Sequence, residues 1–362
     1  MEKLKIVVYA ICLNEEKFVD RWYESMKEAD EIVVLDTGST DKTVQKLMSH
    51  SIKVVTQKIT PWRFDEARNI SLSLVPNDAD VCVCTDLDEV FEKGWRQKIE
   101  QVWIKNKTQQ MRYKYVWNVE NGQDKTTFVY EKIHARHGFS WIYPVHEILS
   151  HRPLNSTQIC INSDLILRHY PDETKSRKQY LNLLELSVKE HPESDRNTHY
   201  LAREYMFNER FTDAIKYFKK HLSMPNSTWA EERSASERYM GDCYKNLGKP
   251  RLALKHYKLA VLESPDTREP YFSLAIFYYD KKDYSSALIT LLSMLKITSR
   301  TLSYISNSDL FGELPYDYIY MSFYYLKNYK KALEYCKIAL TFAPDDKRIK
   351  QNLSIFENLC KN

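Results

Sequence analysis

Residues 81–91, VCVCTDLDEVF, set a short apolar run directly before three carboxylates, those of Asp86, Asp88 and Glu89. A short continuous apolar run of this kind predicts a buried β-strand. In an extended segment, residues i and i+2 lie on one face, so Asp86 and Asp88 are expected to face one side while Leu87 points to the core. Two such carboxylates suit a hard cation, Mn²⁺ or Mg²⁺. The stretch therefore predicts a metal-binding acidic tip on a buried strand.

Strand-like and helix-like segments alternate through the first 91 residues. The apolar, β-branched runs at 5–13, 31–36, 52–59 and 80–86 predict strands, and the segments 15–29, 39–49 and 64–75 predict helices. This alternation is typical of a mostly parallel sheet covered by helices on both faces. Ligands of such sheets bind at the carboxyl ends of the strands, where Asp36 ends the second strand and Asp86 and Asp88 end the fourth.

The turn after the first strand excludes one class of nucleotide-binding protein. A Rossmann dehydrogenase needs a GxGxxG turn there, but residues 11–16 read ICLNEE and contain no glycine. A P-loop is absent as well. If this sheet binds a diphosphate, a cation rather than a glycine-rich turn has to neutralise the phosphate charge.

The second half of the chain has helical periodicity and an internal repeat. Small residues recur at the expected contact of paired helices: Ala202 with Ala214, Gly241 with Ala253, and Ala275 with Ala287, followed by Tyr320 with Ala332. The pattern resembles the tetratricopeptide repeat and predicts an all-α solenoid with an insertion in its third repeat. An unspecialised helical domain is the alternative. We expect three segments: an α/β domain over 1–172, a connecting helix over 173–192 and helical repeats over 193–362.

Bulk composition limits location and partners. The net charge of +4 gives no strong basic field for nucleic acid or an anionic membrane. The first apolar run is too short to span a bilayer and lacks a cleavage site, so neither a membrane span nor a signal peptide is predicted. Seven scattered cysteines without a CxxC pair favour a reducing, cytoplasmic location.

Four stretches, in this order, resemble the family 2 glycosyltransferases of GT-A fold. They are VYAICLNEEKFVDRWYESM at 8–26, DEIVVLDTGSTDKT at 30–43, FDEARNISL at 64–72 and CTDLDEVF at 84–91. The resemblance covers roughly residues 5–170. It implies that Asn14, Glu15 and Asp36 line the pocket for the base and ribose of a nucleotide, usually uridine. Arg68 and Asn69 lie on the predicted helix before the fourth strand, whose face is expected to approach the donor phosphates, and a solvated helix surface is the alternative.

Two later stretches extend this resemblance. HARHGFSWIYPVHEILSHRP at 134–153 and ILRHYP at 166–171 are similar to a subgroup in which a family 2 domain is joined to tetratricopeptide repeats, with the layout of the sublancin S-glycosyltransferase type. Transfer with inversion needs a base for the acceptor and a cation for the leaving diphosphate. Glu147 is the predicted base. Asp86 and Asp88, with His169 or His146, are the predicted metal ligands, and Asp88 is also placed among the catalytic residues.

These features predict a metal-dependent transferase that moves a hexose from a UDP-sugar to a protein or peptide acceptor bound with help from the repeats. A saccharide, a glycolipid or a modified DNA base is the alternative acceptor, although the modest charge disfavours DNA. A third hypothesis is a non-catalytic scaffold in which the repeats bind a partner. The sequence does not determine the oligomeric state, and a homo-oligomer is one of the possible states.

Overall fold

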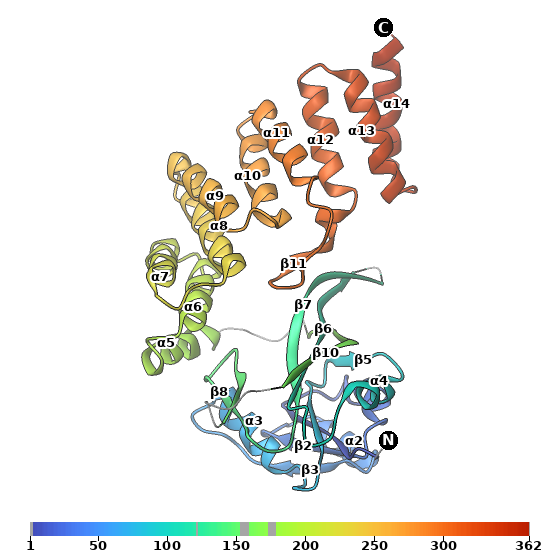
Figure 1. Cartoon of the computed structure of the whole chain (residues 1–362), viewed down its shortest axis with the longest axis vertical. Helices are drawn as coiled ribbons and strands as arrows, with labels where there is room; N and C mark the ends of the chain where they lie inside the picture. Colours follow the sequence, from blue (N-terminus) through green and yellow to red (C-terminus); the bar gives the residue numbers. More distant parts are fainter. Residues whose placement is uncertain (1–2, 121, 153–158, 173–178, 362) are drawn as a thin grey trace. The chain divides into compact units, whose positions relative to one another are not determined.

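The computed structural model describes residues 3–120, 122–152, 159–172 and 179–361, and divides into two compact units, Met1–Glu190 and His191–Asn362 (Figure 1). In the described ranges, no helix is both long and apolar enough to cross a bilayer. The seven cysteines are free thiols.

The first unit begins with the predicted alternation of strands and helices. Strands β1 (Ile6–Cys12), β2 (Glu31–Asp36), β3 (Lys53–Thr56) and β4 (Val81–Cys84) pair in parallel in the order β3-β2-β1-β4. Helices α1 (Val19–Met26), α2 (Thr43–Ser49) and α3 (Phe64–Ser73) connect them. The prediction of this part of the fold is confirmed.

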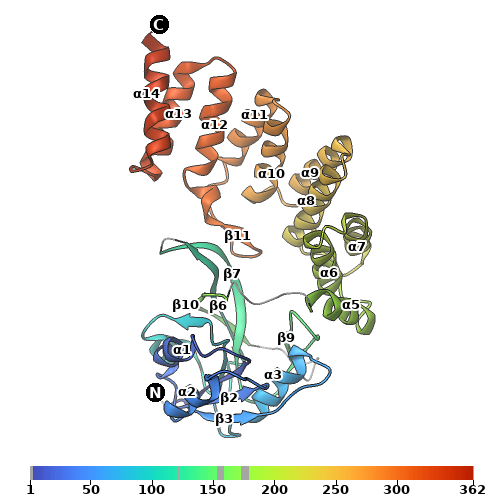
Figure 2. The same cartoon turned by 180° about the vertical axis from the view of Figure 1, so that it is seen from behind.

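The sheet continues beyond β4 with antiparallel and parallel neighbours, in the order β4-β7-β6-β10-β5. These strands are β7 (Gln123–His134), β6 (Gln110–Glu120), β10 (Cys160–His169) and β5 (Glu89–Phe91). A hairpin of β8 (Phe139–Ile142) and β9 (Ile148–His151) lies beside α3 (Figure 2). Helices α4 (Trp95–Val102) and α5 (Tyr180–Glu190) complete the unit, whose mixed, mostly parallel sheet is GT-A-like.

Strand β1 is buried on both faces, which explains its unbroken apolar sequence. Ile6 and Val8 pack with Trp22 of α1 in one cluster, whereas Val7 and Tyr9 belong to a second cluster on the opposite face. That second cluster also includes Leu72 of α3 and Trp141 of β8. The carboxyl ends of β1, β2 and β4 therefore meet at one edge of a sheet fixed from both sides.

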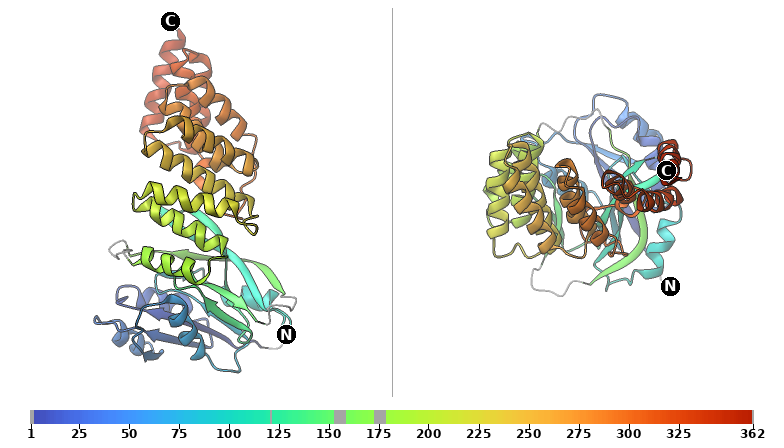
Figure 3. Two further views of the ribbon diagram at one scale, coloured as in Figure 1. Left: turned by 90° about the vertical axis from the view of Figure 1, so that its left-hand side faces the viewer. Right: turned by 90° about the horizontal axis from the view of Figure 1, so that it is seen from above.

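The second unit is a stack of helix pairs, as predicted (Figure 3). The pairs are α6 (Asp195–Phe207) with α7 (Phe211–Ser223), α8 (Ala230–Asn246) with α9 (Pro250–Glu263), α10 (Arg268–Asp280) with α11 (Tyr284–Met294), and α12 (Leu314–Tyr325) with α13 (Tyr329–Phe342), followed by α14 (Lys347–Lys361). A Cβ atom at Gly241 would lie 2.7 Å from the ring of Tyr257, so only glycine fits this contact.

The predicted insertion lies between α11 and α12. Residues 296–313, here called the strap, contain β11 (Ser306–Asn307) and the 3₁₀ turn η1 (Ser308–Phe311). Each pair packs on the next mainly through its second helix, α7 on α8, α9 on α10 and α11 on α12, and the first helices α6, α8 and α10 also contact one another. These first helices therefore line the inner side of the TPR-like stack.

Candidate active site

The loops after β1 and β2 are joined by side-chain to backbone hydrogen bonds. The backbone N–H of Asn14 donates to Oγ of Ser39 (2.8 Å), and that of Glu15 donates to Oγ1 of Thr43 (2.7 Å). In return, Oδ1 of Asn14 accepts from the N–H of Thr40 (2.8 Å). Asn14 has φ +55°, a left-handed conformation that asparagine tolerates. The motif residues thus fix the shape of this edge of the sheet.

Asp36 is buried at the end of β2. Its carboxylate accepts hydrogen bonds from the backbone N–H groups of Gly38 (3.2 Å) and Ser39 (3.1 Å), which forms a tight turn. Asp36 therefore shapes the same edge as Asn14 and Glu15. The structure brings these three residues together, and their contact with a nucleotide stays a prediction.

The acidic tip after β4 is a turn rather than an extended segment. The N–H of Glu89 donates to the carbonyl of Asp86 (3.0 Å), and residues 87 and 88 form the turn. Leu87 is buried as expected. Because the chain turns, Asp86 and Asp88 do not share one face. The extended geometry expected from the i, i+2 spacing is wrong.

Asp86 is held by two cations of the chain. One oxygen lies 2.7 Å from Nη2 of Arg68, and the other lies 3.5 Å from Nζ of Lys132. Burial opposes ionisation, but the two cations outweigh it and hold the pKa of Asp86 well below its usual range. Asp86 is therefore an ionised carboxylate whose charge is already balanced.

Asp88 pairs with His169 at the end of β10. Oδ2 of Asp88 lies 3.3 Å from Nε2 of His169, and Nδ1 of His169 lies 3.2 Å from the carbonyl oxygen of Trp117. A carbonyl only accepts, so in the neutral ring Nδ1 carries the proton and Nε2 faces Asp88 with its lone pair. Burial opposes the charged ring, but Asp88 outweighs this effect and raises the pKa of His169. This position therefore favours a positive charge.

Asp88 and His169 fit a divalent cation. A carboxylate oxygen and an imidazole nitrogen at 3.3 Å can bind one ion, and the carbonyl of Trp117 fixes the ring as outer partners of metal ligands do. Asp86 does not join them: among the described residues, its oxygens do not lie within 4.8 Å of both other ligand atoms. Asp86 is paired with Arg68 and Lys132, and its role as a third metal ligand stays a prediction. His146, the alternative ligand, packs on the ring of Tyr180 at 5.8 Å.

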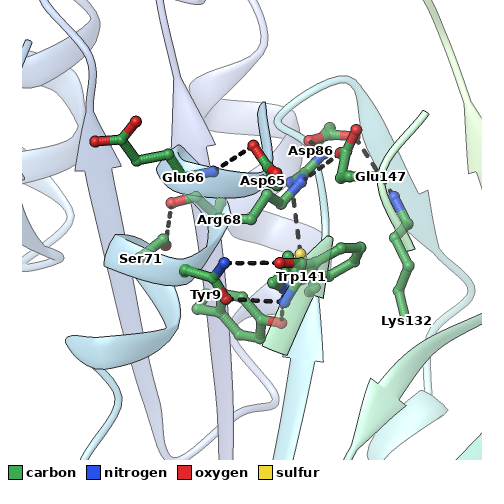
Figure 4. A network of polar contacts seen from close by, with 12 residues as sticks. Tyr9, Asp65, Glu66, Arg68, Ser71, Asp86, Lys132, Trp141 and Glu147 are labelled. Atoms are coloured by element: carbon green, nitrogen blue, oxygen red, sulfur yellow. Dashed lines mark hydrogen bonds and ion pairs between the residues drawn. The ribbon is translucent and has the colours of Figure 1, made fainter. Parts of the chain in front are cut away.

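Arg68 connects the acidic tip to the predicted base. Its Nε donates to Oε1 of Glu147 (2.8 Å), and its guanidinium lies over the ring of Trp141, 5.4 Å from the centroid (Figure 4). Nε1 of Trp141 donates to the hydroxyl of Tyr9 (2.9 Å), which lies 2.7 Å from Nε2 of His134. Arg68 is buried. Arg68 therefore holds the carboxylates of Asp86 and Glu147 in place. A contact between Arg68 and the donor phosphates stays a prediction.

Asn69 fixes the β8–β9 hairpin. Its amide nitrogen donates to the carbonyl of Trp141 and its amide oxygen accepts from the N–H of the same residue, both at 2.8 Å. Both polar ends of the amide are therefore bonded to the backbone of β8. A donor contact of Asn69 stays a prediction.

Sequence reasoning missed the pair formed by Glu89 and Lys132. Both side chains are buried, with Nζ of Lys132 2.7 Å from Oε1 of Glu89 and the hydroxyl of Tyr115 donating to the same oxygen (2.8 Å). The third carboxylate of the DLDE stretch, Glu89, was the one feature of the sequence that could have indicated a buried ion pair here. Its partner lies 43 residues away on β7, which local patterns do not reveal.

Comparison with known proteins agrees with this architecture. Residues 7–173 match the family Glycosyl transferase family 2, and residues 159–305 match the family ChAPs (Chs5p-Arf1p-binding proteins). The first part of the chain is thus similar to the family 2 glycosyltransferases over residues 7–173, and the stack of helix pairs follows it.

One curated relative is the lipopolysaccharide core biosynthesis glycosyltransferase LpsC of Rhizobium meliloti (strain 1021). It is 30% identical over 105 residues, which are 28% of this chain and 37% of LpsC. The chain thus matches little more than a third of that protein's length.

Solved structures similar to this chain include TPR proteins. A TPR repeat-containing protein from Cytophaga hutchinsonii is 17% identical, with a TM-score of 0.43 over 51% of this chain and 66% of that one. YrrB, a TPR protein with an unusual peptide-binding site, is 18% identical, with a TM-score of 0.36 over 48% of this chain and 81% of that one.

Proposed function

We propose that this protein is a metal-dependent, inverting glycosyltransferase that moves a hexose from a UDP-sugar to a protein or peptide acceptor. The observation that carries the proposal is the pair of Asp88 and His169, which fits a divalent cation beside the end of β4. The family 2 match of residues 7–173 supports the class of reaction. The loops of Asn14 and Asp36 at the same edge are where a nucleotide would bind.

In this mechanism, Asp88 and His169 would hold Mn²⁺ or Mg²⁺, which neutralises the charge that develops on the departing diphosphate. Glu147 accepts the proton of the acceptor as the acceptor attacks the anomeric carbon. Arg68 holds Oε1 of Glu147, whereas Oε2 accepts no hydrogen bond from the residues that the structure describes. Oε2 is therefore the oxygen that receives the proton.

A saccharide acceptor is the second candidate, because the curated relative LpsC carries a name from lipopolysaccharide core biosynthesis. The two candidates share the donor chemistry and differ in what the helical repeats bind. Incubation of the purified protein with UDP-hexoses and Mn²⁺ tests the shared part. We expect slow release of UDP that stops when a chelator is added, and no release from any UDP-hexose would contradict the proposal.

Replacing Glu147 with glutamine tests the base. We expect kcat with a hydroxyl acceptor to fall about 10²–10⁴-fold with little change in donor affinity, because a base acts mainly in the transition state. Glu185→Gln, on α5, is the matched control and should keep wild-type kcat. Full activity of Glu147→Gln with a hydroxyl acceptor would remove Glu147 from the mechanism.

A further inference from the structure

The inner side of the first two helix pairs carries a cluster of arginine and tyrosine side chains. On α6, Arg196, Tyr200 and Arg203 follow one another at intervals of four and three residues, which places them on one helix face. Arg196 and Arg203 lie over the ring of Tyr200, at 4.6 and 5.1 Å from its centroid. The neighbouring helix α8 adds Arg238 and Tyr239 to the cluster.

Two of these arginines lack a counterion. Arg203 and Arg238 both lie over the ring of Tyr239, at 5.7 and 4.8 Å, and neither has an ion pair or hydrogen bond with any residue in the described ranges. Nε of Arg203 is buried without an acceptor. The carboxylates nearest to Arg238 are used elsewhere: Asp242 accepts from the hydroxyl of Tyr257 (2.6 Å), and Glu269 accepts from a backbone N–H. Half-buried guanidinium groups without partners are costly for a folded protein.

The neighbouring titratable groups respond to this positive charge. Burial acts to raise the pKa of Tyr239, but Arg203 and Arg238 outweigh it and lower the pKa. The pKa of His199 is lowered by burial first and then by the same arginines. Burial disfavours a charge of either sign, so it is the lowered pKa of Tyr239 that indicates stabilisation of an anion here.

The strap shows that this inner surface accommodates extended polypeptide. The hydroxyl of Tyr304 lies 2.9 Å from Nε2 of His199 on α6, and the ring of Tyr304 packs on Trp229. Further along the strap, the N–H of Asn307 donates to Glu269 of α10 (3.0 Å). Arg238 and Tyr304 line one hollow between the strap and the inner helices. The hollow is small, and Glu231 and Glu269 line it as well, so it admits a single side chain to Arg238 rather than a whole peptide segment.

We propose that Arg203 and Arg238 form an anion-binding site for the carboxylate side chains of an acidic peptide segment. This extends the proposed function, on which it rests for the role of that peptide as acceptor. Guanidinium groups bind carboxylates through paired hydrogen bonds, and Arg203 and Arg238 make no hydrogen bond with any residue in the described ranges. The faces of Tyr200 and Tyr239 are already occupied by guanidinium groups, so they offer little stacking surface to a sugar ring. This arrangement favours a peptide over a saccharide.

Fluorescence anisotropy with a labelled (Glu-Ser)₄ peptide tests the site in the full-length protein without any donor. We expect binding that weakens with added salt, no comparable binding of (Gln-Ser)₄, and a loss of affinity of about tenfold for Arg203→Gln or Arg238→Gln. Arg251→Gln, at an exposed position on α9, is the matched control and should bind like wild type. Thermal unfolding checks the fold: removing an unpartnered charge should leave the melting temperature equal or higher.

Two results would overturn the proposal. One is equal affinity of wild type and the Arg203→Gln/Arg238→Gln double variant for (Glu-Ser)₄. The other is stronger binding of an acidic oligosaccharide, for which oligogalacturonate is the probe, than of the peptide. Because the assay contains no donor, its failure leaves UDP release unchanged. A failure of the proposed function would instead appear as absent UDP release with peptide binding intact.

Discussion

Replacing Asp88 with asparagine is expected to lower the rate of sugar transfer about 10²–10³-fold while the fold is retained. The variant would lose one of the two proposed metal ligands, and several kcal/mol of transition-state stabilisation correspond to such a factor. UDP release from a UDP-hexose measures the effect. Asp164→Asn, at an exposed position on β10, is the control and should keep the wild-type rate. Wild-type turnover of Asp88→Asn would show that the acidic tip has no part in the reaction.

Replacing Arg68 with methionine is expected to have the largest effect on stability, a loss of about 3–5 kcal/mol. Methionine replaces only the apolar stem of arginine, so it leaves the carboxylates of Asp86 and Glu147 without the cation that bridges them. The unfolding transition of the first unit, followed by calorimetry of the whole chain, measures the loss. Arg112→Met removes a half-exposed pair with Glu131 and should cost at most about 1 kcal/mol. Equal losses in the two variants would contradict a bridging role for Arg68.

The effect of Arg68→Met should also depend on pH. Asp86 has a lowered pKa in the folded protein, so its ion pair stabilises the fold fully above the unfolded value of about 3.9. That contribution is lost as the pH falls from there through the folded pKa. The stability difference between wild type and Arg68→Met should therefore be largest near neutral pH and shrink below about pH 4. A difference that grows on acidification would have the wrong sign.

The order of strands and helices in the first half was predictable because each element has a local pattern. The unbroken apolar run of β1 and the recurring small residues of the helix pairs reflect burial on both faces and close helix contact. The turn at residues 85–88 was not predictable from spacing alone. It depends on a hydrogen bond from Glu89 and on the partners of Glu89, Lys132 and Tyr115, which lie on other strands.

The roles within the site were predictable only in part, for the same reason. Asp88 and His169 lie in separate motifs that the fold brings together. Asp86 instead forms an ion pair with Arg68, a residue whose sequence position predicted a contact with the donor phosphates. A guanidinium on a helix gives no sign in the sequence of whether it faces solvent, phosphate or a buried carboxylate. Packing against Trp141 decides this for Arg68.

Calorimetric titration of the protein with UDP tests the central claim most directly. In the presence of Mn²⁺ or Mg²⁺ we predict saturable binding that weakens at least about tenfold when a chelator removes the metal, because the diphosphate has no glycine-rich turn to hold it. The Asp88→Asn variant should bind UDP equally weakly with and without metal. Equal affinity of the wild-type protein in metal and in chelator would contradict the account.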